Sequence, residues 1–222
     1  MNNTILSVTF TGADEKTDLD AVANVDAEIG ILYSANPESR NRYPRKEWIT
    51  EAVKSLPRAS LHVCGRKARA NLLSDTTIAE GFQRIQVNGK VEPQELVSIG
   101  EMYPKHRIIT QYVDRPNHNM PLLELQLPNH ELLIDASGGR GTLPKSWNPP
   151  KTYKRIGYAG GLGPDNIKEQ LDLIFPVASF DFWIDMETSV RVDDWFSIDK
   201  INQCLQNINE YIEDRYGFQT GR

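Results

Sequence analysis

Residues that can do chemistry stand where apolar segments of this chain end. Asp135 closes the apolar segment 132–135, and a glycine-rich run follows it. Gly160 and Gly161 close a second apolar segment, and Pro164 stands where the first turn of a helix is expected. Glycines between a strand and a helix leave backbone N–H groups free for a phosphate, whereas a carboxylate ending a buried strand must be hydrogen-bonded or functional. The sequence therefore predicts an acid–base group near an anion site.

The segment around the last predicted strand supplies further polar groups. Thr188 and Ser189 follow the apolar segment 180–186 and are candidates to complete a phosphate site with Gly160 and Gly161. Three acidic residues of this region share one strand face and could ligate a metal, but ligands from other strands are not evident. We therefore predict no metal site and no cofactor. The three acidic residues are Asp181, Asp185 and Glu187.

Cys64 ends the apolar segment 60–64 and has two interpretations. As a lone cysteine it is typically a small buried hydrophobe. Alternatively, Lys67 or Arg66 lowers the pKa of its thiol, which then acts as a catalytic base. His62 lies on the same strand face but deeper, where we expect a hydrogen-bonded core residue. The second cysteine, Cys204, falls on the apolar stripe of a helix and is predicted to be core.

The elements that position these residues alternate between short apolar runs and helical patterns. Apolar strands separated by helices indicate a parallel sheet covered on its outer face. Eight such units favour a single-domain α/β fold over residues 1–222, a (β/α)8 TIM barrel, whose active sites lie at the carboxyl ends of the strands. The predicted strands are 5–10, 27–33, 60–64, 82–87, 107–113, 132–135, 155–159 and 180–186.

Helical spacing is clearest over residues 46–56, 166–174 and 197–211, where apolar residues recur on one face. Ser197 is the expected N-cap of the last of these helices. Residues 142–154 are rich in proline and predict a long irregular loop after the sixth strand. The basic residues at 40–46 and 66–69 are expected to be solvated helix starts or ligand contacts.

Composition limits the classes of partner. The chain has 222 residues, 39% hydrophobic and 25% charged, with a net charge of −5. This balance is typical of a soluble globular domain and offers no broad basic surface for nucleic acid. We find no signal-peptide pattern and no apolar run long enough to span a membrane, so we expect a cytoplasmic protein. The sequence does not indicate the oligomeric state.

Taken in order, several segments resemble the phosphoribosylanthranilate isomerase family. Residues 8–12 occupy the place of the family's first-strand Lys-Ile-Cys-Gly, and residues 29–33 with 40–43 resemble its Ile-Gly-Phe strand and Ser-Pro-Arg loop. Residues 159–162 with Pro164 and Asn166 match best. The remaining matches are residues 85–89 with Val-Gln-Leu-His-Gly, residues 133–135 with Gly139, Gly141, Thr142 and Trp147, and residues 185–191 with Asp-Val-Ser-Ser-Gly-Val-Glu.

The resemblance implies a (β/α)8 barrel and an isomerase, an intramolecular oxidoreductase of tryptophan biosynthesis, acting on a phosphorylated sugar derivative by an Amadori rearrangement. In this family a first-strand cysteine is the general base and a sixth-strand aspartate the general acid. By position, Asp135 would be the acid. Arg42, or Arg40 if the loop is shifted, would hold the substrate carboxylate. Gly160, Gly161, Thr188 and Ser189 would hold the phosphate.

Three positions depart from the family pattern. Thr11 stands at the base position, and a hydroxyl cannot remove a carbon-bound proton without help, so Thr11 and Cys64 both remain candidates for the second catalytic group. Asn88 replaces a histidine. Glu187 adds a negative charge near the phosphate unless Arg191 or Arg140 neutralises it. The alternatives are an altered phosphosugar-binding protein without turnover, or an enzyme of different specificity on the same barrel.

Overall fold

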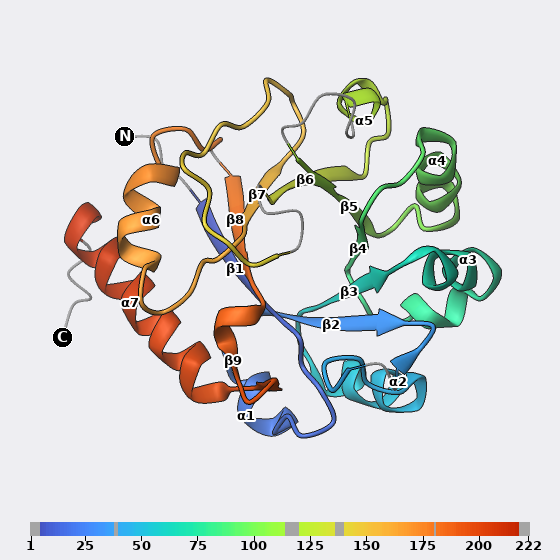
Figure 1. The fold of residues 1–222 in the computed structure, drawn as a ribbon, viewed down its shortest axis with the longest axis horizontal. Helices are drawn as coiled ribbons and strands as arrows, with labels where there is room; N and C mark the ends of the chain where they lie inside the picture. Colours follow the sequence, from blue (N-terminus) through green and yellow to red (C-terminus); the bar gives the residue numbers. More distant parts are fainter. Residues whose placement is uncertain (1–4, 38–39, 114–119, 136–139, 180, 218–222) are drawn as a thin grey trace.

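The computed structural model describes residues 5–37, 40–113, 120–135, 140–179 and 181–217. Strands β1 to β8 pair in chain order and in parallel to close a barrel, which helices surround (Figure 1). The predicted (β/α)8 barrel is therefore confirmed. The strands are β1 Ile5–Thr11, β2 Glu28–Ser34, β3 Ala59–Cys64, β4 Arg84–Asn88, β5 Arg107–Tyr112, β6 His130–Asp135, β7 Ile156–Ala159 and β8 Asp181–Met186.

The connections differ in regularity. In the described part of the β6–β7 connection, residues 140–155 contain no helix, which confirms the predicted long loop. After β8, the short strands β9 Arg191–Val192 and β10 Trp195–Phe196 form an antiparallel hairpin. The helices are α1 Leu19–Ala23, α2 Lys46–Ser55, α3 Arg66–Ser74, α4 Pro93–Met102, α5 Met120–Glu124, α6 Ile167–Ile174 and α7 Ile198–Tyr216, with 3₁₀ turns η2 Thr76–Ala79 and η3 Thr188–Val190.

The predicted boundaries are close to those observed. Each strand end lies within two residues of its predicted position, although residue 180 falls outside the described residues. The side chain of Ser197 caps α7 by accepting a hydrogen bond from the Lys200 N–H, as predicted. Pro164 is a correction, because it lies in a turn before α6 and not in the first turn of that helix. The helix begins after Asn166.

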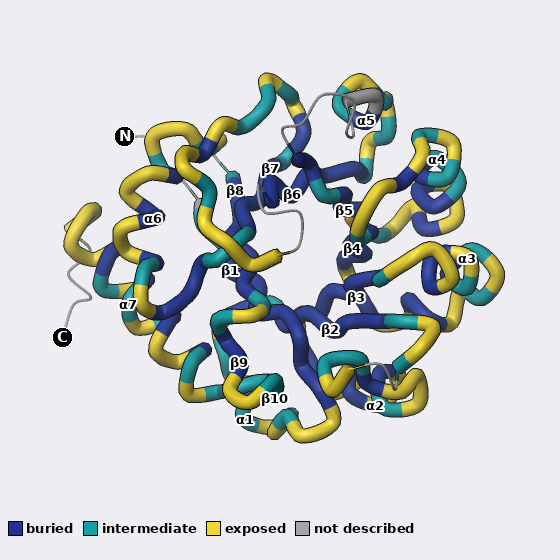
Figure 2. The backbone as a smooth tube through the Cα atoms, viewed as in Figure 1, coloured by how far each residue is buried: buried dark blue, intermediate teal, exposed yellow. Residues whose placement is uncertain are grey.

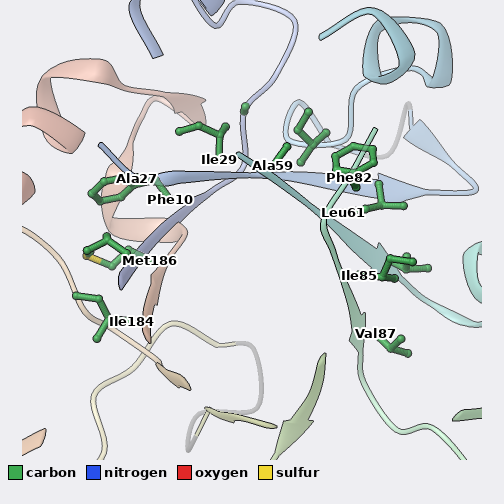
Figure 3. Packing of buried hydrophobic residues seen from close by; sticks show 14 of the residues in the cluster. Phe10, Ala27, Ile29, Ala59, Leu61, Phe82, Ile85, Val87, Ile184 and Met186 are labelled. Carbon is green, nitrogen blue, oxygen red and sulfur yellow. The ribbon is translucent and has the colours of Figure 1, made fainter. Parts of the chain in front are cut away.

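Alternate residues of each strand build the core between barrel and helices. Because successive side chains of a strand point to opposite faces, every second residue reaches the surrounding helices. Figure 3 shows this cluster, and Figure 2 shows that burial concentrates in the strands while the connecting segments are largely exposed. All of the labelled residues are buried: Phe10, Ala27, Ile29, Ala59, Leu61, Phe82, Ile85, Val87, Ile184 and Met186.

The barrel interior is packed with the other set of side chains. Ile109, Leu133, Ala159 and Trp183 form a separate buried apolar cluster on strands β5 to β8. Arg84 lies over the Trp183 ring, 4.2 Å from its centroid, and its guanidinium also pairs with carboxylates of β2 and β6. A side-chain layer of this kind closes the barrel below the carboxyl ends of the strands, so a ligand can enter only from the upper rim. No helix among the described residues has the length and apolar character needed to cross a membrane.

Candidate functional site

One cavity of about 520 Å³ lies at the carboxyl ends of strands β2 to β8. Residues from the ends of these strands form its floor, and the loops after β2, β7 and β8 contribute to its walls. This is the end of the barrel at which (β/α)8 enzymes carry their active sites. The structure brings together most of the predicted site residues on its lining: Arg40, Arg42, Cys64, Asn88, Asp135, Gly160, Gly161, Glu187, Thr188 and Ser189.

Two predicted residues are not on the lining. Arg140 is exposed on the β6–β7 loop. Thr11 is buried at the end of β1, where its hydroxyl reaches the cavity only through a neighbouring carboxylate. Gly138 and Gly139, the glycines that follow β6, lie outside the described residues. The cavity therefore gathers the predicted phosphate, carboxylate and acid–base candidates, with Thr11 beneath them.

Asp135 lies at the carboxyl end of β6 and is 95% buried, with 5% of its surface exposed. Strand pairing sets Asp135 beside Ala159 of β7, the residue that precedes the glycines. The Gln111 side chain donates a long hydrogen bond of 3.5 Å to Asp135 Oδ2. The same side chain accepts a bond of 2.9 Å from the Gly89 N–H, which fixes its orientation. Asp135 is thus a positioned carboxylate at the cavity floor.

A second floor carboxylate, Asp185 of β8, lies above Thr11. The Thr11 hydroxyl donates a hydrogen bond of 2.7 Å to Asp185 Oδ1. Burial raises the pKa of Asp185 to about 7; the Thr11 bond lowers it, and the nearby charge of Glu187 raises it further. Asp185 therefore exchanges a proton near neutral pH. It is the functional candidate that we assigned only to a possible metal site.

His62 supports this arrangement from β3. Gln86 donates to His62 Nδ1 at 3.0 Å, so the ring proton is on Nε2, which lies 3.1 Å from Ser60 Oγ and 3.4 Å from Thr11 Oγ1. Burial lowers the pKa of His62 to about 3, and the charge of Arg84 lowers it as well. His62 is therefore a neutral, hydrogen-bonded core residue, as predicted. It orients Thr11 without carrying charge.

Glu187 follows β8 and is paired with Arg42 of the β2–α2 loop. Arg42 Nη1 lies 2.6 Å from Glu187 Oε1, and Arg42 Nη2 lies 2.7 Å from Asp194 Oδ1. Burial raises the pKa of Glu187, while the charge of Arg42 and its hydrogen bond lower it. Arg42 is the direct partner of Glu187, and the charge of Arg191, one of the two arginines expected to neutralise Glu187, lowers its pKa as well.

The β9–β10 hairpin aims Asp194 at this pair. Its two central residues, Asp193 and Asp194, have φ values of 50° and 60°, which is the left-handed conformation of a tight two-residue turn. Arg191 begins the hairpin, pairs with the fully buried Asp14 at 2.9 Å and donates to the Asp194 carbonyl. The hairpin is thereby fixed to the β1–α1 loop. Sequence reasoning missed Asp194 because no strand was expected after β8.

The glycine turn after β7 is packed tightly against its neighbours. Gly161 has φ +72°, and a Cβ there would lie 2.6 Å from the Leu143 nitrogen of the β6–β7 loop. A Cβ on Gly163 would overlap the Ser189 Cβ, and the Ser189 hydroxyl donates to the Leu162 carbonyl. Close approach of three loops therefore requires glycine at both positions.

Asn166 fixes the same turn from below. Its side chain accepts from the Gly163 N–H at 3.0 Å and donates to the Gly161 carbonyl at 2.8 Å. Within the part of the chain that the structure describes, the amides of Gly160 and Gly161 donate to no protein group. The turn thus presents free N–H groups at the cavity wall next to Ser189, an arrangement suited to an anion.

Cys64 lies on the floor but is a poor nucleophile. Burial raises the pKa of its thiol to about 12, although a hydrogen bond from Asn88, 3.3 Å long, acts in the opposite direction. The thiol donates to the His62 carbonyl. The hypothesis that Lys67 or Arg66 lowers this pKa is therefore wrong, since both cations are exposed at the start of α3 and burial dominates. Cys204 is fully buried, as predicted.

The acidic residues of the β8 region do not gather into a metal site. Asp181 pairs with Arg155 at 2.9 Å, at the opposite end of β8 from Glu187. Among the described residues, no group of three or more histidine, cysteine or acidic side chains has an arrangement that would hold a metal ion. Each of the three acidic residues has a different partner instead.

Solved structures share this fold. Phosphoribosyl anthranilate isomerase from Thermus thermophilus is similar with a TM-score of 0.67 and 18% identity, covering 92% of this chain and 98% of that chain. N-(5'-phosphoribosyl)anthranilate isomerase from Pyrococcus furiosus gives 0.65 and 14%, covering 93% and 100%. For 3-hexulose-6-phosphate synthase from Salmonella typhimurium the values are 0.58 and 14%, covering 92% and 99%.

These likenesses establish the barrel. At such identities they show a common fold and leave the reaction to be argued from the site. No protein-family model and no curated protein sequence matches the chain. The structures that it is similar to nevertheless include phosphoribosylanthranilate isomerases and another barrel enzyme whose name contains a sugar phosphate.

Proposed function

We propose that this protein is an isomerase that binds a phosphorylated sugar derivative and converts an aldose form into a ketose form by proton transfer. The observation that carries the proposal is a single cavity lined by two buried carboxylates, Asp135 and Asp185, and by the glycine turn at Gly160 and Gly161. Phosphate binding at one wall would hold the sugar carbons over the carboxylates. The barrel neighbours named for phosphoribosyl and hexulose phosphate compounds support the same substrate class.

The phosphate would bind at Gly160, Gly161, Thr188 and Ser189. Free glycine amides are the donors that such a group needs, and the Thr188 hydroxyl could add another, whereas the Ser189 hydroxyl would first have to leave the Leu162 carbonyl. The turn after β7 lies against η3 after β8. Arg42 would compensate only part of the repulsion between a phosphate dianion at this wall and the Glu187 carboxylate. Phosphate affinity should therefore depend strongly on how the glycine N–H groups of the turn are oriented.

Asp135 and Asp185 would share the proton transfers. Opening of a phosphorylated aldosylamine requires an acid that protonates the ring oxygen, which we assign to Asp135. Conversion of the resulting protonated imine to the ketose then requires a base that removes the proton from the adjacent carbon, which gives an enolamine. The enolamine takes up a proton at the former aldehyde carbon and loses the proton of its hydroxyl group to become the ketose. Asp185 supplies this base, because its pKa near 7 leaves it partly ionised at neutral pH. Thr11 orients Asp185, and Cys64 is a floor residue with no ionised thiol.

The test is turnover by the purified protein. Phosphoribosylanthranilate and its carboxylate-free phosphoribosylaniline counterpart would be supplied in turn, and product formation followed by fluorescence or by chromatography. We expect Asp135→Asn to lower kcat by about 10²- to 10⁴-fold, as for loss of a general acid. Asp172→Asn, on α6 outside the cavity lining, is the matched control and should keep full activity. Equal activity of both variants would disprove the role of Asp135.

A phosphosugar-binding protein without turnover is the second candidate. Thr11 favours it, because the position of the family's catalytic base holds a hydroxyl that is already donated to Asp185. A binder would show a thermal shift with ribose 5-phosphate, lost in Gly161→Ala, and no turnover of any probe. In that case, activity gained by Thr11→Cys would show that the other groups of the site are competent.

A further inference from the structure

Both terminal nitrogens of the Arg42 guanidinium are already engaged by carboxylates of the protein. Nη1 binds Glu187 at 2.6 Å and Nη2 binds Asp194 at 2.7 Å, and the Arg42 side chain is only 17% exposed. Recognition of a ligand carboxylate by arginine normally uses two parallel N–H groups of the same guanidinium. A ligand carboxylate that takes both terminal nitrogens in this way would compete with Glu187 and Asp194 for Arg42, whose Nε is buried without a hydrogen-bond partner among the described residues.

The contacts of Asp194 and Glu187 oppose their displacement from Arg42 by a ligand. Asp194 lies in the tight β9–β10 turn, which Arg191 holds through its bonds to Asp14 and to the Asp194 carbonyl. Glu187 is anchored by the end of β8. A new partner for Arg42 would weaken the pairing of one of these carboxylates with its counter-charge. The cost would fall mainly on Glu187, which burial desolvates, because the Asp194 side chain is 39% exposed.

Two other cations contribute to the cavity lining, Arg40 and Arg69. Arg69 pairs with Glu95 of α4 at 2.7 Å and is buried. Arg40 is exposed at the outer rim. Glu187, in contrast, belongs to the cavity wall together with the floor carboxylates Asp135 and Asp185. The lining therefore carries three carboxylates, while Arg42 and Arg69 are already paired with carboxylates of the protein.

We propose that the cavity selects a phosphorylated sugar derivative with no carboxylate near Arg42, and that Glu187 accepts a hydrogen bond from a hydroxyl or amine group of this ligand. The inference rests on the proposed function, since the phosphate fixes the ligand in the cavity. It departs from the role that the family resemblance implies for Arg42. Here Arg42 is a positioning residue for Glu187, and Glu187 determines specificity.

The experiment compares two stable ligands that differ by one carboxylate: 1-anilino-1-deoxyribitol 5-phosphate and its 2-carboxyanilino counterpart. Their dissociation constants would be measured by calorimetry with the full-length protein. We expect the neutral ligand to bind at least about tenfold more tightly, because a carboxylate would face Glu187. In Glu187→Gln the difference should shrink to about threefold or less, mainly through tighter binding of the carboxylated ligand.

Asp194→Asn is the matched control, because it also removes one carboxylate partner of Arg42 but lies outside the cavity lining. It should retain most of the preference for the neutral ligand. Tighter binding of the carboxylated ligand by the wild type, lost in Arg42→Met, would overturn the inference and leave the proposed function intact. If neither ligand binds while the protein is folded by circular dichroism, the proposed function and the inference both fail.

Discussion

Replacement of Asp185 by asparagine should stabilise the protein above neutral pH. Asp185 is 7% exposed, and burial raises its pKa from 3.8 to about 7. Between these two values the folded state holds a proton that the unfolded state has released, so stability falls as pH rises through this window. Above about pH 7 the folded protein must bury the charge. Asparagine removes this cost and can still accept the Thr11 hydrogen bond.

The magnitude follows from the size of the shift. One pKa unit corresponds to about 1.4 kcal/mol, so a shift of about three units costs roughly 4 kcal/mol once the pH exceeds 7. Between pH 5 and pH 8, the cost rises only from pH 5 up to the folded-state pKa of about 7, which is about two pH units. The gain in unfolding free energy from Asp185→Asn should therefore be roughly 3 kcal/mol larger at pH 8 than at pH 5.

Urea denaturation of wild type and variant at these two pH values measures the difference directly. Thr11→Val serves as the opposing control, because it removes the hydroxyl that stabilises the ionised carboxylate. It should destabilise the protein more at pH 8 than at pH 5, and this pH dependence should vanish in the Asp185→Asn background. A gain from Asp185→Asn that is equal at both pH values would refute the raised pKa and the assignment of Asp185 as base.

Two other regions give predictions of reactivity and stability. Because burial raises the Cys64 pKa to about 12, iodoacetamide should alkylate Cys64 about a thousandfold more slowly in the native protein at pH 8 than in urea, as followed by mass spectrometry; comparable rates would contradict the burial argument. Arg191→Met should cost about 3–5 kcal/mol in urea denaturation because it leaves Asp14 buried without its partner. Arg215→Met, which removes an exposed pair with Asp172, should cost less than about 1 kcal/mol; equal costs would contradict the distinction.

The barrel was predictable because its strands carry a simple signal. Each is a short apolar run between helical or turn segments, and the residues that end these runs are those found on the cavity floor, such as Cys64, Asn88 and Asp135. Position along a parallel strand fixes which end of the barrel a residue occupies. Sequence alone could therefore place candidate groups at one rim.

The partners of those groups were not predictable to the same extent. The Arg42–Glu187 pair joins residues separated by 145 positions, and its geometry depends on a two-residue turn at Asp193 and Asp194 that has no apolar pattern. The Cys64 pKa depends on burial at the floor, which outweighs nearby basic residues in the sequence. Side-chain pairing and desolvation depend on the closed barrel, and the spacing of apolar residues in the sequence does not predict them.

Two departures from the family pattern, Thr11 and Glu187, are each compensated by a neighbouring residue in this cavity. Thr11 lacks a thiol, but its hydroxyl holds Asp185, whose burial brings a carboxyl group into the pH range where it can exchange protons. Glu187 adds a negative charge, but Arg42 compensates it and is thereby withdrawn from the ligand. Under the proposed function, such a site would have groups for proton transfer and would admit a different ligand. Its specificity should therefore respond to Glu187 and its pH dependence to Asp185, and the two effects should be separable by mutation.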